Sequence, residues 1–159
     1  MSMLTTIATI AAILGSALVG GIFFAFSNFV MKALARVPSP EGIAAMQSIN
    51  VVVLNRWFLG SFIGTAAICL LLAGIAISGW EKPISLWLLG GAVSYVAGVW
   101  LVTIVGNVPL NQRLAEVEPA DAASSQIWED YLDRWTKLNS KRAGSAVCAA
   151  LLFSVALVI

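Results

Sequence analysis

The stretch of residues 128–142, WEDYLDRWTKLNSKR, runs directly into the apolar segment 143–159. Side chains three or four residues apart in a helix lie on the same face. One such face would carry Trp128, Leu132, Trp135, Asn139 and Arg142. Most of the remaining charge would lie elsewhere, on Glu129, Asp130, Asp133 and Lys137. The pattern predicts one helix that begins in water and ends in the hydrocarbon of a membrane.

The composition indicates an integral membrane protein. The 159 residues are 60% hydrophobic and 11% charged, with a mean hydropathy of +0.93, whereas about a quarter of the residues of a soluble domain are charged. We therefore expect an all-α fold, an integral membrane four-helix bundle with cytoplasmic helical extensions, formed by residues 1–159 as one domain. A net charge of +1 without a basic face excludes nucleic acid as a partner. The lipid bilayer is the expected partner.

Few residues of the chain can bind metal. There is no histidine, and the two cysteines, Cys69 and Cys148, stand alone in apolar segments. Because imidazole is the commonest metal ligand, we expect no metal and no cofactor. At 1.5 Å per helical residue, Cys69 would lie roughly 20 Å deep and Cys148 roughly 9 Å. A disulfide is not expected at that separation.

Apolar segments long enough to cross ~30 Å of hydrocarbon are predicted at about 4–31, 57–78, 84–106 and 143–159. The first basic residue is Lys32, so the first segment is expected to be a retained span and not a secretory signal. A helix starting near Pro40 should lead into the second span from well outside the membrane. Residues 107–111, NVPLN, are expected to end the third span, with Asn107 as its cap, because Pro109 interrupts the hydrogen-bond ladder.

Basic residues are distributed unequally between the loops. One side of the membrane would carry Lys32, Arg36, Arg56, Arg113, Arg134, Lys137, Lys141 and Arg142, and the other only Lys82. The positive-inside rule then predicts a multi-pass protein of the plasma (inner) membrane, with both termini outside and the long loops cytoplasmic.

Polar side chains gather at one predicted level of the bundle. Asn28 ends the first span, Asn50, Asn55 and Arg56 precede the second, Asn107 and Asn111 end the third, and Asn139 and Arg142 precede the fourth. Trp128, Tyr131 and Trp135 would roof these helix ends. Amide and guanidinium groups beside an apolar floor predict a pocket for a small lipophilic aromatic or quinone-like ligand.

No span carries Asp, Glu, Lys or Arg, which disfavours a coupled transporter.

Each of these features also has a purely structural interpretation. Asn28 and Asn50 could serve only as inter-helix hydrogen bonds, and residues 107–111 only as a helix stop. Trp128 and Trp135 could form an aromatic belt or the core of a water-exposed extension, with Arg56 and Arg142 as interface anchors.

Three motifs carry a resemblance to a known family. They are MQSIN at residues 46–50, NVPLN at 107–111, and the series Trp128, Tyr131, Trp135, Asn139 and Arg142. In this order between four spans they resemble the anthrone oxygenase-like family. The resemblance covers most of the chain and implies a small four-span membrane protein. In characterised members it implies oxidation of an anthrone to an anthraquinone by dioxygen, without an evident metal or flavin.

The resemblance also suggests roles for particular residues. Arg142 or Arg56 would stabilise an enolate oxygen, with Asn139 and Asn107 orienting it. The ligand-binding residues would be Asn28, Asn50, Arg56, Asn111, Trp128, Tyr131 and Trp135. Family members commonly read Trp-Asn-His where this chain has Leu138, Asn139 and Ser140. A histidine there would be the natural base, so this chain has no obvious one; Tyr131 would need a strongly lowered pKa.

Three hypotheses for the function follow. The first is a cofactor-independent oxygenase acting on a small lipophilic aromatic. The second is a membrane protein that binds such a molecule without turnover. The third is an accessory subunit that docks on a protein partner through thin helix faces such as Gly90, Gly91 and Gly98.

Overall fold

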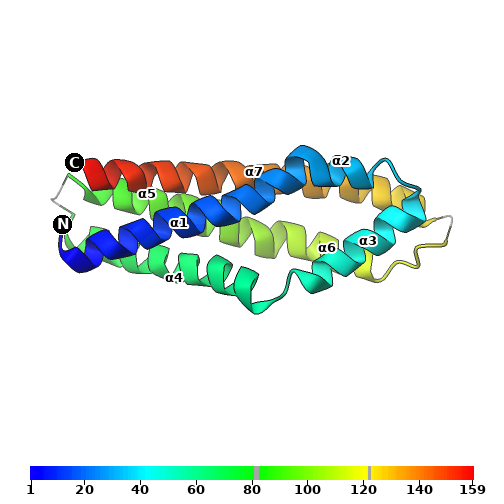
Figure 1. Cartoon of the computed structure of the whole chain (residues 1–159), viewed down its shortest axis with the longest axis horizontal. Coiled ribbons are helices and arrows are strands. Elements are labelled where there is room, and N and C mark those ends of the chain that lie inside the picture. Colours follow the sequence, from blue (N-terminus) through cyan, green and yellow to red (C-terminus); the bar gives the residue numbers. More distant parts are fainter. Residues whose placement is uncertain (81–82, 122) are drawn as a thin grey trace.

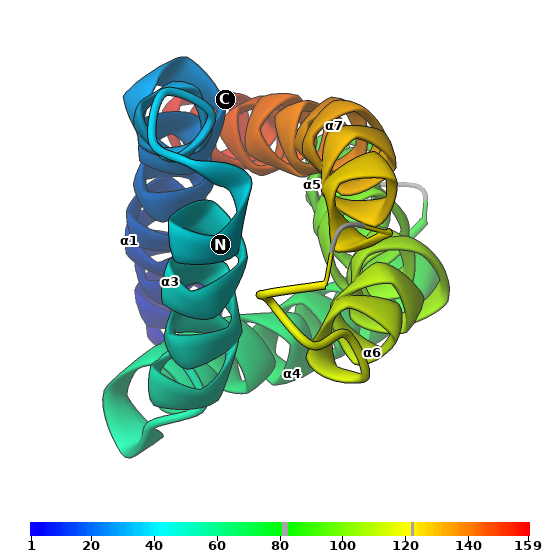
Figure 2. The same ribbon diagram turned by 90° about the vertical axis from the view of Figure 1, so that its right-hand side faces the viewer.

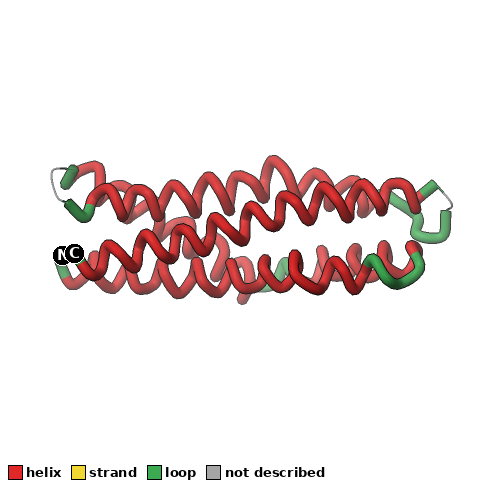
Figure 3. The backbone as a smooth tube through the Cα atoms, turned by 90° about the horizontal axis from the view of Figure 1, so that it is seen from above, coloured by secondary structure: helices red, strands yellow, loops and turns green. Residues whose placement is uncertain are grey.

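The computed structural model describes residues 1–80, 83–121 and 123–159, and all the secondary structure in these ranges is helical (Figures 1 and 3). Four helical rods are long and apolar enough to cross a membrane, at Met3–Leu34, Arg56–Ser78, Ser85–Ala115 and Ser124–Val158. The predicted all-α, four-span membrane fold is confirmed.

The four rods form an up-and-down bundle. Viewed end on in Figure 2, α1 (Met3–Ala25), α4 (Arg56–Ser78), α5 (Ser85–Tyr95) and α7 (Ser124–Val158) surround a common axis. Both chain termini lie at one end of the bundle, which we call the terminal end (Figure 1). The opposite end, the polar end, holds α2 (Met31–Leu34), α3 (Ser39–Val52), α6 (Val108–Ala115) and the first half of α7.

Small side chains set the helix spacing in the membrane-spanning half. A Cβ on Gly20 of α1 would lie 3.0 Å from the Cβ of Ala146 on α7, and one on Gly91 would lie 2.7 Å from the Phe153 ring. Apolar helices gain little from hydrophobic association in lipid, so such close backbone approach supplies packing energy. The thin faces of Gly91 and Gly98 predicted for a partner are therefore used inside the bundle, with Gly98 against Ser145.

The first and last rods extend beyond the predicted spans. The helix of α1 continues through a π-helical segment, η1 (Phe26–Val30), into α2 and ends at Leu34 instead of residue 31. The last rod, α7, is a single helix of 35 residues. The sequence prediction that residues 128–142 and the last apolar segment form one continuous helix is confirmed.

The second rod differs from the prediction. The helix expected to run from near Pro40 into the second span is divided into α3 and α4 by residues 53–55. The side chain of Asn55 accepts hydrogen bonds from the backbone N–H groups of Trp57 at 3.0 Å and Phe58 at 3.1 Å. This N-cap satisfies the first free donors of α4 and starts a new helix there.

The third rod contradicts the predicted helix stop. Residues 107–111 do not end the helix, and Asn107 is no C-cap, because α6 continues to Ala115. Two π-helical segments, η2 (Val96–Leu101) and η3 (Thr103–Asn107), come just before Pro109. Their wider turns replace the i to i−4 pattern that a proline ring obstructs, which lets the helix continue.

The cysteines lie apart, as expected. Cys69 is buried in the bundle core and Cys148 is exposed, and both are free thiols. Lys82, the single basic residue of the other side in the topology prediction, lies outside the described residues.

Candidate functional site

Three aromatic side chains form a continuous stack along the polar half of α7. The rings of Trp128 and Tyr131 have centroids 5.6 Å apart, and those of Tyr131 and Trp135 are 6.0 Å apart. All three are buried against α3 and α6, and Gly42 of α3 lets Trp128 approach closely. The predicted amphiphilic stripe is therefore an inward-facing wall (the aromatic ladder), not a membrane belt.

Two asparagines hold the ladder in register. The Oδ1 atom of Asn111 accepts hydrogen bonds from the Tyr131 hydroxyl at 2.9 Å and from the Trp135 Nε1–H at 2.8 Å. The Nδ2 of Asn50 donates to the same Tyr131 oxygen at 3.4 Å. Burial raises the pKa of Tyr131 above the usual range of a phenol, against a smaller opposing effect of the Asn50 bond. The shift is opposite to the strongly lowered pKa that Tyr131 would need to act as the base, so its contacts support a hydrogen-bonding role.

Arg142 lies one level deeper, at the start of the apolar part of α7. Its side chain is 5% exposed. Nη2 donates to Asn139 Oδ1 at 2.6 Å and Nη1 donates to Thr103 Oγ1 at 3.1 Å. The guanidinium carbon also lies 4.1 Å from the centroid of the Phe23 ring and 5.3 Å from that of Trp135. Neutral partners and aromatic faces surround this cation.

The hydrogen bonding of Arg142 is incomplete. Its Nε has no hydrogen-bond partner, and within the described ranges no carboxylate pairs with the guanidinium. A buried charge is costly unless it is paired. Aromatic faces supply only part of that compensation, so the site favours a ligand that brings a negative charge.

Asn139 fixes the position of Arg142. Its Nδ2 donates to the Phe23 carbonyl oxygen at 2.6 Å and to Ser27 Oγ at 2.7 Å, which joins α7 to α1 and η1. Its Oδ1 is thereby turned toward Arg142. Asn139 acts as a positioning residue for the guanidinium.

Asn107 is buried behind the ladder. Its Nδ2 donates to the Trp135 carbonyl oxygen at 3.2 Å, and its Oδ1 has no partner. It does not line the cavity described below. The geometry therefore gives Asn107 a role in joining η3 to α7 and no direct contact with a ligand.

A cavity of about 380 Å³ lies between Arg142 and the ladder. Its apolar walls include Phe23, Phe26, Phe58 and the ring of Trp135, and its polar lining groups are Gln47, Asn50, Thr103, Asn111, Gln112 and Arg142. Val51 and Leu54, at its rim where α3 gives way to α4, are 72% and 64% exposed. The cavity has the size of a pocket for a small organic ligand, and its rim lies where α3 gives way to α4.

Several predicted site residues lie elsewhere. Trp128 and Tyr131 support the wall but do not line the cavity. Asn28 is exposed on the outer face of α1 and η1. Arg56 is exposed with its guanidinium 5.1 Å from the ring of its neighbour Trp57, an arrangement typical of an interface anchor. The predicted convergence therefore holds for Asn50, Asn111, Trp135 and Arg142 at the cavity, with Asn139 behind Arg142.

Ser140 also lies outside the cavity. Its hydroxyl is 2.9 Å from Ser27 Oγ and 2.9 Å from the Thr136 carbonyl oxygen, on the outer side of α7. The position at which family members commonly have histidine therefore does not contact a ligand in this cavity.

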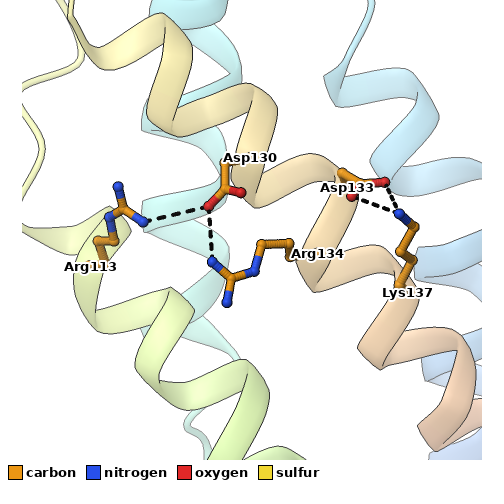
Figure 4. A network of polar contacts seen from close by, with 5 residues as sticks. All are labelled: Arg113, Asp130, Asp133, Arg134 and Lys137. Carbon is orange, nitrogen blue, oxygen red and sulfur yellow. Dashed lines mark hydrogen bonds and ion pairs between the residues drawn. The ribbon is translucent and has the colours of Figure 1, made fainter.

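The charged residues of α7 form ion pairs on its solvent side (Figure 4). Asp130 lies 3.5 Å from Arg113 and 3.4 Å from Arg134, and Lys137 lies 2.7 Å from Asp133. These carboxylates point away from the cavity, as the helical pattern predicted, and leave no acidic group on its lining.

Sequence reasoning did not name Phe23, Phe26, Thr103, Gln47 and Gln112 as site residues. Gln47 lies inside the motif at residues 46–50, and the other four sit in segments that read as ordinary span or loop. The π-helical segments η1 and η3 contain or adjoin Phe26 and Thr103, and π-bulges have no clear sequence signature although they are frequent at functional sites.

The fold and the site together define a four-span membrane protein with a buried cationic pocket at one end. Comparison with known families matches residues 55–152 to the family described as anthrone oxygenase, and the chain belongs to this family. The matched region contains Asn107, Asn111, Trp135, Asn139 and Arg142. No curated protein and no solved structure matches the chain.

Proposed function

We propose that the protein is a cofactor-independent oxygenase that oxidises an anthrone-like aromatic in the cavity beside Arg142. Membership of the family supports the reaction type. The observation that carries the proposal is the buried Arg142 guanidinium, which faces an aromatic-lined cavity without a carboxylate partner.

The reaction follows from what such a pocket stabilises. An anthrone loses a proton from its methylene carbon and becomes an enolate, whose oxygen is placed against Arg142. A fixed cation in a site of low dielectric stabilises this anion far more than water does. Dioxygen then takes electrons from the enolate and forms a carbon–oxygen bond. Loss of water from the resulting hydroperoxide gives the anthraquinone, so that one oxygen atom enters the product and the other enters water.

The proton acceptor in this scheme is water at the cavity mouth. The described lining contains no carboxylate or thiol, and Tyr131, whose pKa burial raises, does not line the cavity. Because Arg142 lowers the pKa of the bound substrate, a weak acceptor suffices. Asn139 holds Arg142 in place, and Asn50 and Asn111 offer amide groups to the other edge of the ligand.

The test is oxygen uptake by the protein in nanodiscs with 1,8-dihydroxyanthrone, corrected for oxidation without protein. Arg142→Met should lower kcat/KM at least about 100-fold, the usual cost of losing a group that stabilises a developing oxyanion. Arg56→Met, which removes an exposed guanidinium, is the matched control and should retain full activity. Equal rates for Arg142→Met and the native protein would refute the proposal.

Binding without turnover is the second candidate, and the absence of a base from the cavity lining favours it. Saturable quenching of Trp135 fluorescence by the anthrone, with no protein-dependent oxygen uptake, would support this function.

We further propose that the polar end faces the cytoplasm from the plasma membrane. The basic residues Lys32, Arg36, Arg113, Arg134 and Lys141 all belong to segments at this end. Labelling of single cysteines from outside the cell should modify residue 1 or 2 and leave position 118 unmodified; the reverse pattern would overturn the orientation. A protein partner also stays a prediction, and co-purification of a stoichiometric second chain would test it.

A further inference from the structure

A second concave surface lies on the opposite side of α1 and α7 from the cavity. This surface, the α1–α7 groove, has a volume of about 740 Å³ and shares no lining residue with the cavity. Its walls are Ala17, Gly20, Gly21 and Phe24 of α1, and Ala143, Gly144, Val147, Ala150, Leu151 and Ser154 of α7. The groove runs along membrane-spanning segments, so its surroundings are lipid.

Two glycines keep the groove open without serving the contact between the helices. A Cβ built on Gly21 or on Gly144 meets no atom within 4 Å. Gly20 differs, because its Cβ would approach Ala146 closely. Gly21 and Gly144 therefore widen the outer surface rather than bring α1 and α7 together.

The groove is chemically different at its two ends. Toward the polar end it is lined by Ser27, Asn28, Lys32 and Ser140. Throughout the described ranges no ion pair involves Lys32, although Lys32 borders a neighbouring hollow that is also lined by Glu129 and by Asp133, which is paired with Lys137. The groove thus combines an apolar channel with a free cation and several hydrogen-bonding groups at one end.

The length of the α1–α7 groove matches the thickness of one leaflet of a bilayer. The lining on the first rod extends from Ala17 of α1 to Lys32 of α2, about 22 Å at 1.5 Å per residue. One leaflet contributes about 15 Å of hydrocarbon, which leaves room for a headgroup at the Lys32 end. A transmembrane helix of another chain would instead place hydrocarbon side chains against Lys32 and Asn28, where their polar groups would lose water without a partner.

We propose that the α1–α7 groove binds one anionic phospholipid of the surrounding membrane, with an acyl chain along Gly21 and Gly144 and the phosphate at Lys32, Asn28 and Ser27, whose hydroxyl accepts from Asn139 and Ser140 and keeps its own hydrogen free. This site is independent of the proposed oxygenase reaction. Lys32 provides the charge complementarity, and the hydroxyl and amide groups donate hydrogen bonds to phosphate oxygens.

Native mass spectrometry of the delipidated protein, titrated with dioleoylphosphatidylglycerol, tests the proposal. One lipid should bind tightly per chain, with dioleoylphosphatidylcholine binding more weakly. Gly21→Leu should abolish this binding by filling the channel, while Gly74→Leu, at an exposed glycine of α4 that also has open space, should not. Lys32→Gln should weaken binding about fivefold, and Lys141→Gln should leave it unchanged.

Two results would overturn the proposal. The first is equal phosphatidylglycerol binding by the native protein and Gly21→Leu. The second is a dimer of this chain that Gly21→Leu dissociates, because the groove would then be an interface between copies. Oxygen uptake by Gly21→Leu should equal that of the native protein, so failure of lipid binding and failure of the oxygenase proposal are distinguishable.

Discussion

The terminal half of the bundle packs by size, whereas the polar half packs by hydrogen bonds. In the terminal half, Ala12, Ala149 and Gly91 bring helices together around rings such as Phe153. In the polar half, the side chains of Asn111, Asn139 and Arg142 join three rods, and a cavity remains among them. The comparison separates stability from function: the buried helix contacts of the first half, such as that of Gly91, leave no room for added atoms, and the second half leaves a cation short of partners.

The largest expected effect is on activity in the polar half. Asn139→Ala removes the acceptor of Arg142 and the link to Phe23 and Ser27. We expect kcat/KM for 1,8-dihydroxyanthrone to fall about 100-fold, which corresponds to about 2.7 kcal/mol. Because Asn139 acts through Arg142, addition of Arg142→Met to this variant should cause little further loss. If the losses of kcat/KM in the two single variants added in the double variant, the two residues would act independently, and Asn139 would not be a positioning residue for Arg142.

The next effect is on stability in the terminal half. A Cβ at Gly91 meets the Phe153 ring at 2.7 Å, so Gly91→Ala should destabilise the fold by about 1–3 kcal/mol. Gly74→Ala, where the space is open, should leave stability unchanged or raise it slightly. Thermal unfolding in detergent measures both. Activity per folded molecule should stay native in both variants. A loss of this activity in Gly91→Ala alone would contradict the proposal that the terminal half provides stability and the polar half provides activity.

Two buried tyrosines allow a matched comparison. Tyr131→Phe removes the donor to Asn111, and Tyr95→Phe removes a 3.2 Å bond to the Phe62 carbonyl oxygen. Each should cost about 1 kcal/mol of stability. Only Tyr131→Phe should weaken anthrone binding, measured by fluorescence quenching, because Asn111 lines the cavity. Equal weakening by Tyr95→Phe would show that the ladder has no special relation to the site.

The smallest effect is expected on the solvent side of α7. Asp130→Asn breaks exposed ion pairs with Arg113 and Arg134. Stability should change by less than about 0.5 kcal/mol and activity should stay native. A large loss of activity would mean that these carboxylates reach the reaction after all.

Much of this arrangement follows from spacing in the sequence. The predicted helix face carried Trp128, Leu132, Trp135, Asn139 and Arg142. Four of these five residues are buried together, whereas Leu132 is only partly buried and Tyr131 takes the fully buried position beside Trp128 and Trp135. The level of the polar residues follows from the lengths of the apolar spans. Asn50, Asn111 and Arg142 could be brought together by these two arguments alone.

The positions of the remaining site residues depend on local helix geometry, which the spacing of residues in the sequence does not reveal. In η1 the π-helical turn holds an extra residue, which turns the following side chains around the axis. Ser27 thereby meets Asn139 while Asn28 faces outward. Likewise η3 carries the helix through Pro109 and turns Thr103 toward Arg142. The position of Asn28 away from the cavity and the continuation of the helix past Asn107 both arise at these segments.

The central claim is that Arg142 stabilises an anionic oxygen on a bound aromatic ligand. Hydroxyanthraquinones change their visible spectrum on ionisation, so a spectrophotometric titration of bound 1,8-dihydroxyanthraquinone reads this stabilisation directly. The pKa of the bound phenol should be lower by at least about 1 unit in the native protein than in Arg142→Met, as expected for a cation within hydrogen-bonding distance. The same pKa in both proteins, with the ligand bound in each, would contradict the account.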